Sequence, residues 1–180
     1  MGSRKTLGGN SRLGGSATRR LGRRSSATPG RSSQLTVRVA GDRVRLPLSA
    51  GRVRRVVRAV WSAEGRAAEP PSRQADVSIV FVGPARMRLL NRAWKRHDRA
   101  TDVLAFTLHS PGGGLTGEVY ICAAIARAAA REHGVPAQEE LVRLVVHGTL
   151  HLLGYDHPES AARTRSPMWR RQERFVEALA

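Results

Sequence analysis

The stretch from residue 136 to residue 157 restricts the fold of this chain more than any other. Eight Leu and Val side chains surround the helical axis within residues 141–153, so a helix here has no polar face to turn toward water. Pro136 suits the first turn of this helix, and Glu139 and Glu140 lie near its positive end. A helix that is apolar on all sides is buried, so we expect the domain to be built around it.

Three histidines occur in this stretch, at His147, His151 and His157. Residues four apart lie on the same face of a helix, so His147 and His151 can bind one ion together. Gly154 can end the helix and reverse the chain, which brings His157 back toward the pair. Without a metal, three buried imidazoles would need three separate hydrogen-bonding partners. The spacing therefore predicts a metal site, and three neutral ligands leave a position open for water or a substrate oxygen.

The residue after the first histidine separates this motif from that of the metzincin peptidases, which share its histidine and glycine spacing. Those enzymes have a glutamate there as general base, whereas this chain has Gly148. Three other routes stay open: hydroxide formed on the metal, a base elsewhere in the chain, or a nucleophile of the substrate such as an RNA 2′-hydroxyl. Asp156 is the one acidic residue inside the motif, and it fits either the base or a group that orients a histidine.

Apolar periodicity predicts the remaining elements of the domain. The pattern at 35–48, with Gly41-Asp42 between two alternating segments, favours a hairpin-like start. A helix after Pro84 is expected to turn four residues inward, namely Met87, Leu90, Ala93 and Trp94. Further strands are expected at 76–82, 101–106 and 117–122, and further helices at 49–65, 123–133, 136–153 and from 167. This order predicts an α+β or mixed α/β fold, with a single sheet of about four strands covered by helices and the metal site at the end of a buried helix.

The first part of the chain differs from the rest in composition. Residues 1–34 carry eight arginines and lysines and no acidic residue, within a formal net charge of +17. Burial of so few apolar side chains cannot offset the conformational entropy lost on ordering. We therefore expect a disordered basic tail ahead of a domain at 35–180. Besides a plain solvated tail, the composition fits an RNA-contacting arm or an organelle transit peptide, although repeated glycines weaken the latter. The single cysteine, Cys122, fits a reducing compartment such as the cytoplasm, with an organelle as the alternative, and no apolar run suggests a membrane partner.

Cations recur along the helix expected after Pro84 and in the segment that follows it. They are Arg88, Arg92, Lys95, Arg96 and Arg99. Such a row is either a solvated helix face or a surface that binds phosphate groups. Because the whole chain is strongly basic, a polyanionic partner is favoured, and we take these five residues as candidate RNA-binding residues.

The motif His147-Gly148-Thr149-Leu150-His151-Leu152-Leu153-Gly154-Tyr155-Asp156-His157 closely resembles the signature of the YbeY family of single-strand-specific endoribonucleases and rRNA maturation factors. The similarity covers about residues 35–180. Its other positions are Asn91, Trp94, Asp98, Thr101-Asp102-Val103-Leu104-Ala105-Phe106, Gly117-Glu118, Ile121, Met168 and Gln172-Glu173. The resemblance implies one Zn2+ ion on His147, His151 and His157, and a catalytic set made of these three residues and Lys95.

The resemblance also implies a biological role: maturation of the 3′ end of 16S rRNA and ribosome quality control. The implied partners are rRNA and the small ribosomal subunit, with ribosomal proteins or an assembly GTPase beside them. Lys95 stands where the family usually has an arginine for RNA binding or catalysis. Because lysine keeps the charge but lacks the bidentate fork, Arg92 or Arg96 is expected to share its task. Two alternatives stay open, a non-catalytic ribosome-assembly factor with a structural zinc and a metallopeptidase.

Overall fold

The structure is a computed structural model, and it describes residues 34–41, 47–65, 74–109, 114–158 and 160–180. The predicted basic tail lies outside these ranges except for Gln34, and so do residues 42–46 of the predicted hairpin. In the described part, the chain folds into one four-stranded sheet with helices on both faces.

The described helices and strands follow the predicted order, with one added 3-10 helix and without the second strand predicted within 35–48, of which residues 42–46 are not described. In chain order they are β1 (Gln34–Gly41), α1 (Ala50–Glu64), β2 (Gln74–Val82), α2 (Pro84–Lys95), β3 (Val103–His109), β4 (Gly114–Cys122), α3 (Ala123–His133), α4 (Ala137–Leu152), η1 (Ala161–Arg165) and α5 (Pro167–Leu179). Local signals set several ends: Ser49 accepts a hydrogen bond from the backbone N–H of Arg52 at 3.2 Å, and Gly134 ends α3 with a φ of +67°.

The sheet has the strand order β1-β2-β4-β3. β1, β2 and β4 run parallel, and β3 runs antiparallel to β4. The predicted mixed α/β fold with a single sheet is therefore confirmed. Of the predicted hairpin-like start, the first segment forms β1, which pairs in parallel with β2, whereas residues 42–46 lie outside the described residues. Parallel strands need a long crossover, and here the crossover contains α1.

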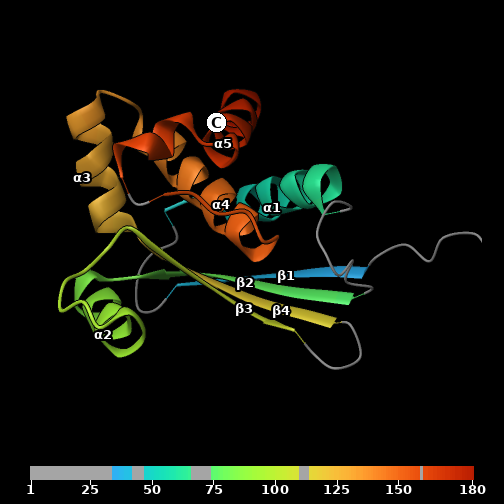
Figure 1. Ribbon diagram of the computed structural model, residues 1–180, viewed down its shortest axis with the longest axis horizontal. Helices are drawn as coiled ribbons and strands as arrows, with labels where there is room; N and C mark the ends of the chain where they lie inside the picture. Colours follow the sequence, from blue (N-terminus) through green and yellow to red (C-terminus); the bar gives the residue numbers. More distant parts are fainter. Residues whose placement is uncertain (1–33, 42–46, 66–73, 110–113, 159) are drawn as a thin grey trace, which may run out of the picture. The chain divides into compact units, whose positions relative to one another are not determined.

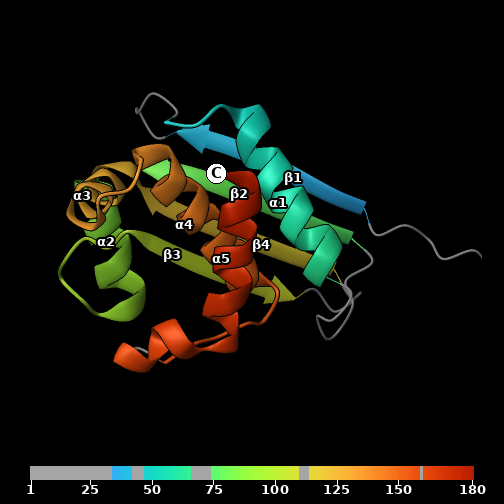
Figure 2. The same cartoon turned by 90° about the horizontal axis from the view of Figure 1, so that it is seen from above.

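α4 is the central helix of the domain. Figure 1 shows α1, α4 and α5 on one face of the sheet and α2 on the other, and Figure 2 shows α1, α4 and α5 lying across the strands. α4 is buried along almost its whole length and packs against α1, α3 and α5. On its sheet side it lies against β3 and β4, where Val119 of β4 faces Gly148. No helix in the described part of the chain is long and apolar enough to cross a membrane.

Gly148 lets α4 lie very close to β4. A Cβ atom added at Gly148 would stand 2.4 Å from Cγ1 and 3.0 Å from Cγ2 of Val119, distances that packed carbon atoms do not adopt. A second close approach occurs where Gly117 of β4 faces the side chain of Leu152. Gly148, which stands where the metzincin peptidases have their glutamate, is therefore also the residue at which α4 contacts β4.

α2 differs from its predicted packing. Met87 is buried and Leu90 is half-buried, as expected, but Ala93 and Trp94 are exposed. In Figure 1, α2 is the one described helix on its face of the sheet, so no second helix of the described residues covers its last turn. The prediction that Ala93 and Trp94 face inward is therefore wrong, because helical periodicity indicates a side of the helix but not how far the covering surface extends.

Candidate metal centre

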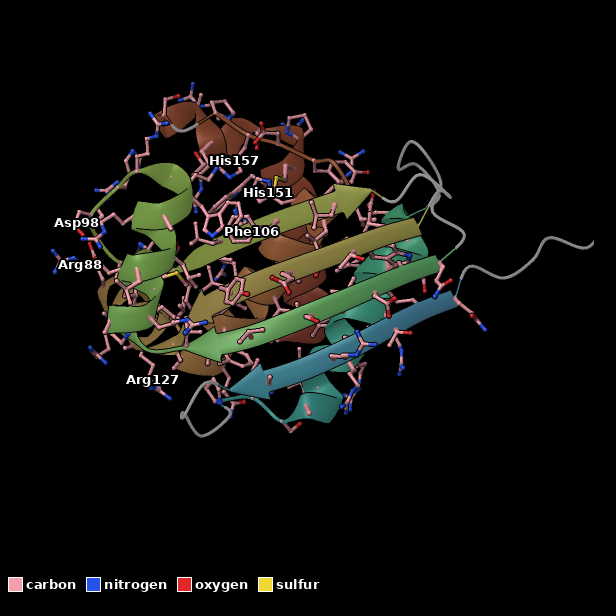
Figure 3. All side chains as sticks on the ribbon, turned by 90° about the horizontal axis from the view of Figure 1, so that it is seen from below. Arg88, Asp98, Phe106, Arg127, His151 and His157 are labelled. Atoms are coloured by element: carbon pink, nitrogen blue, oxygen red, sulfur yellow. The ribbon has the colours of Figure 1, made fainter. Side chains whose placement is uncertain are left out.

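The structure brings the three predicted histidines together. His147 and His151 project from successive turns at the end of α4, and Gly154, with a φ of +85°, reverses the chain after it. This turn returns His157 to the other two, and one ring nitrogen from each histidine lies within 4.8 Å of the others. Figure 3 shows His151 and His157 beside each other at this turn.

Hydrogen bonds fix which nitrogen of two rings carries the proton. The Nδ1 atom of His147 is 2.7 Å from Oε1 of Gln172, and Nδ1 of His157 is 3.0 Å from the carbonyl oxygen of Pro158. These oxygens can only accept, so each Nδ1 donates and each Nε2 keeps its lone pair. The Nε2 atom of His147 lies 3.0 Å from that of His151 and 3.4 Å from that of His157. Lone pairs that meet at this distance suit a shared cation.

The spacing and charge state of the rings fit a bound metal ion. Two nitrogens about 2.05 Å from a tetrahedral zinc ion are about 3.3 Å apart, close to the observed separations. Burial, followed by the charge of His151, lowers the pKa of His147 to about 4. Burial and the charge of His157 also lower the pKa of His151. Both rings are therefore neutral near pH 7, which is the form that binds metals.

A hydrogen-bond chain behind His147 holds its orientation. The side-chain N–H of Gln172 donates to Oε1 of Glu173 at 2.8 Å, so the oxygen of the amide must face His147. Glu173 in turn accepts hydrogen bonds from Arg143 at 3.1 and 3.3 Å. Gln172 is 1% exposed, so water cannot replace its contact with His147. The sequence marked Gln172-Glu173 only as part of a family pattern, and the structure shows their contacts with the site.

A second contact holds the turn that carries His157. The hydroxyl of Tyr155 donates to Oε2 of Glu64 at 2.6 Å, and Arg171 Nε donates to the same oxygen at 3.3 Å. This group joins the end of α1 and α5 to the segment between α4 and His157. The hydrogen bond from Tyr155 to Glu64 therefore restrains the position of the third histidine.

The three histidines line one wall of a cleft of about 410 Å³. The charged side chains of the lining leave a small excess of positive charge: the cations are Lys95, Arg99, Arg143 and Arg163, and the carboxylates are Asp102, Glu140 and Asp156. Asp156 lies in it too, where its Oδ1 atom accepts a hydrogen bond from the backbone N–H of His157 at 2.8 Å. The cleft therefore combines a candidate metal position with groups that attract an anion.

The predicted basic row separates into different positions. Lys95 and Arg99 line the cleft, whereas Arg92 and Arg96 are exposed outside its wall. Arg88 donates to both carboxylate oxygens of Asp98, at 2.8 and 2.6 Å, and Figure 3 shows this pair at the edge of α2. The pairing balances the charge of Arg88 and lowers the pKa of Asp98.

The segment that contains Asp98 is held in place from two sides. Besides the pair with Arg88, the side-chain amide of Asn91 donates to the carbonyl oxygen of Arg99 at 2.8 Å. The remaining cation of the cleft, Arg163, comes from η1. Sequence reasoning missed Arg163 because a single arginine in a short 3-10 turn carries no pattern.

The chain is similar in sequence to proteins of known family. Residues 42–180 match the family model described as Endoribonuclease YbeY. A curated protein of that name from Anaeromyxobacter sp. (strain Fw109-5) is 42% identical over 129 residues, which are 71% of this chain and 64% of that protein. Its counterpart from Desulfitobacterium hafniense (strain Y51) is 43% identical over 115 residues, 58% of this chain and 71% of that protein. The alignment with the first relative thus spans less than two thirds of its length.

The fold has a solved relative as well. A solution structure of a protein from Thermotoga maritima is 27% identical in sequence and aligns with a TM-score of 0.51. That alignment covers 80% of this chain and 89% of the other. The family model spans the histidine motif, the cleft and the helix that orients the first histidine. By this match, the chain belongs to the Endoribonuclease YbeY family.

Proposed function

We propose that this protein is a zinc-dependent endoribonuclease that cleaves single-stranded RNA and acts in rRNA processing, at the 3′ end of 16S rRNA. Its proposed partners are rRNA and the small ribosomal subunit. The observation that carries the proposal is the convergence of three histidine Nε2 atoms on the wall of a basic cleft. Family membership supports the same activity.

The residues of the cleft divide the chemistry among them. When bound to the three histidines, the metal ion supplies Lewis-acid stabilisation of charge that develops on a phosphate oxygen. Lys95, Arg99 and Arg163 bind the RNA backbone and hold one phosphodiester against the histidines. Their positive charge also stabilises the negative charge that develops in the transition state.

Asp156 is the carboxylate that we assign as proton acceptor. Of the other acidic side chains that line the described cleft, Glu140 pairs with Arg143, and Asp102 accepts hydrogen bonds from Thr101 and from the backbone N–H of Val103 through one oxygen. We prefer Asp156 to Asp102 because it directly precedes His157 and because its charge acts on His151. Asp156 uses one oxygen for the backbone of His157. Its second oxygen is thus available for the proton of the attacking group.

The packing of Gly148 speaks against a peptidase. The glutamate of the metzincin motif would project from this position, where even a Cβ atom would meet Val119 at 2.4 Å. A base could enter here only if β4 moved away from α4. The reaction must therefore use a base from another position in the chain. Cleavage of a phosphodiester held by cations is compatible with such a base.

The proposal is tested with His151→Ala, and with His133→Ala as a matched control because His133 is an exposed residue of α3. Both variants and the wild type receive an end-labelled single-stranded fragment of the 16S rRNA 3′ end, and the same fragment annealed to its complement. We expect His151→Ala to lose cleavage by about a hundredfold or more and to lose bound zinc, while His133→Ala retains both.

Three results would contradict all or part of the proposal. Cleavage of the single strand by purified His151→Ala at the wild-type rate would remove the histidines from the reaction. Zinc-loaded wild type that binds the fragment but leaves it intact would instead support a non-catalytic assembly factor. Metal analysis of the purified protein identifies the ion, since a metal other than zinc would overturn that part of the proposal.

A further inference from the structure

Trp94 has an unusual environment for an indole side chain. It is 67% exposed, and together with Leu89 and Leu108 it is one of three large apolar side chains that are mostly exposed in the described part of the chain. Trp94 lies on the same side of α2 as Met87 and Leu90, but unlike these two residues it is mostly exposed. A large aromatic ring left in water at the edge of a cleft is typical of a binding surface.

One side of the indole rests on a support of other aromatic rings. The ring centroids of Trp94 and Phe106 are 5.2 Å apart, and those of Phe106 and Tyr120 are 6.1 Å apart. The hydroxyl of Tyr120 donates to Oε2 of Glu118 at 2.9 Å. The rings come from α2, β3 and β4, and Phe106 lies beside α2 in Figure 3. Phe106 thus contacts the indole and is itself held by Tyr120, while most of the indole surface stays exposed.

The chain places this ring next to the cleft of the histidines. Lys95, the following residue, lines the cleft together with His151. Trp94 also contacts Phe106, and Leu104, two residues earlier on the same face of β3, lines the cleft. Residues two apart on a strand are about 7 Å apart, so a nucleotide bound at this end of the cleft has its base within reach of Trp94. The indole is therefore a neighbour of the expected path of the RNA backbone and is not part of the metal site.

Charge decides which kind of partner suits this surface. Lys95, Arg96 and Arg99 follow Trp94 closely and form no ion pair with any carboxylate that the structure describes. An aromatic ring bordered by unbalanced positive charge suits a ligand with flat rings on an anionic backbone. Single-stranded RNA has both features, whereas the bases of a duplex are already stacked on one another.

We propose that Trp94, supported by Phe106, is a stacking site for one unpaired nucleobase of the substrate and that it favours single-stranded over duplex RNA. The proposal rests on the proposed function in that it takes RNA as the ligand. Stacking on an aromatic ring tolerates every base, so the site contributes strand selectivity without sequence selectivity.

The experiment compares two ligands that differ only in their bases. One is a labelled 2′-O-methyl octamer of adenosine, and the other is the same backbone with abasic positions. Wild type, Trp94→Ala, Trp94→Phe and Leu89→Ala are titrated by fluorescence anisotropy at several salt concentrations. Leu89 is a matched control because it is another exposed apolar residue of α2, about 140° around the helix from Trp94.

We expect Trp94→Ala to weaken binding of the adenosine octamer by about five- to a hundredfold, which corresponds to the loss of one stacked base. Binding of the abasic octamer should not change, and Trp94→Phe should keep most of the affinity. The salt dependence should also stay the same, since no phosphate contact is lost. In cleavage assays, Trp94→Ala should lose part of the preference for the single strand over the duplex.

Equal affinities of Trp94→Ala and wild type for the adenosine octamer would overturn the proposal, and so would an equal loss with the abasic octamer. A change of oligomeric state in Trp94→Ala, with RNA affinity unchanged, would assign the ring to a protein interface instead. These outcomes differ from failure of the proposed function, in which the wild type would cleave no RNA at all. If the wild type cleaves RNA and Trp94→Ala keeps its full single-strand preference, only the stacking site is refuted.

Discussion

Gly148→Ala tests how closely α4 and β4 pack. The new Cβ atom would have its three nearest neighbours in one side chain, at 2.4, 3.0 and 3.3 Å from Cγ1, Cγ2 and Cβ of Val119. Overpacking a core costs about 1–3 kcal/mol, and the shortest of these distances favours the upper end. Alanine contributes about 1 kcal/mol more than glycine inside a helix. The variant should therefore lose about 2 kcal/mol of unfolding free energy.

The effect of Gly148→Ala on the free energy of unfolding should change sign when Val119 is replaced by a smaller residue. Val119→Ala removes both γ carbons, so the closest remaining atom of residue 119 is its Cβ at 3.3 Å. In that background Gly148→Ala should stabilise the protein by about 1 kcal/mol through helix propensity. The two effects together amount to a coupling of about 3 kcal/mol between positions 148 and 119.

Urea unfolding of the four proteins, in a chelator so that metal binding does not contribute, measures this coupling. Gly51→Ala is the control in both backgrounds, because Gly51 lies in α1 and an added Cβ there meets nothing within 4 Å. If Gly148→Ala has the same sign and size with valine and with alanine at position 119, the contact with β4 is not the reason for glycine at position 148.

Three further changes test the site and its surroundings. Gln172→Leu should lower metal affinity about 10- to 100-fold in a chelator competition, because His147 loses the acceptor for its Nδ1 proton. Gln172→Glu keeps an acceptor and should keep most of the affinity. Equal affinities of both variants and wild type would refute the orienting contact. Lys95→Ala should reduce the slope of log affinity against log salt for single-stranded RNA by about 0.7, and an unchanged slope would place the phosphate contact elsewhere. Tyr155→Phe removes the 2.6 Å hydrogen bond to Glu64 and should lower the unfolding free energy in urea by about 1–2 kcal/mol, and a loss below a few tenths of a kcal/mol would mean that water replaces the contact.

The parts that could be predicted from the sequence are those that depend on near neighbours in the chain. His147 and His151 are one helical turn apart and Gly154 supplies the reversal, so the meeting of three histidines follows from eleven consecutive residues. Ser49 and Gly134 mark helix ends in the same local way. In each case, the residues that determine the structure are also those that show the pattern.

Features that depend on distant residues could not be predicted in this way. The contact of Gly148 with Val119 and the approach of Arg163 to the cleft join residues of different elements. The exposure of Trp94 depends on which surface is left uncovered, and its helical spacing indicated burial. The parallel pairing of β1 with β2 likewise requires the crossover through α1, while alternation alone suggested a local turn.

The two restraints on the segment after α2 have a kinetic consequence. The pair of Arg88 with Asp98 and the hydrogen bond from Asn91 to the carbonyl oxygen of Arg99 are made within the free protein. RNA therefore meets a segment whose backbone is already in position, so its exposed cations need only side-chain rotation and no slow rearrangement of the segment has to follow the encounter. Association should be a single bimolecular phase whose rate constant rises as salt is lowered, and salt should set the speed of capture more than temperature does.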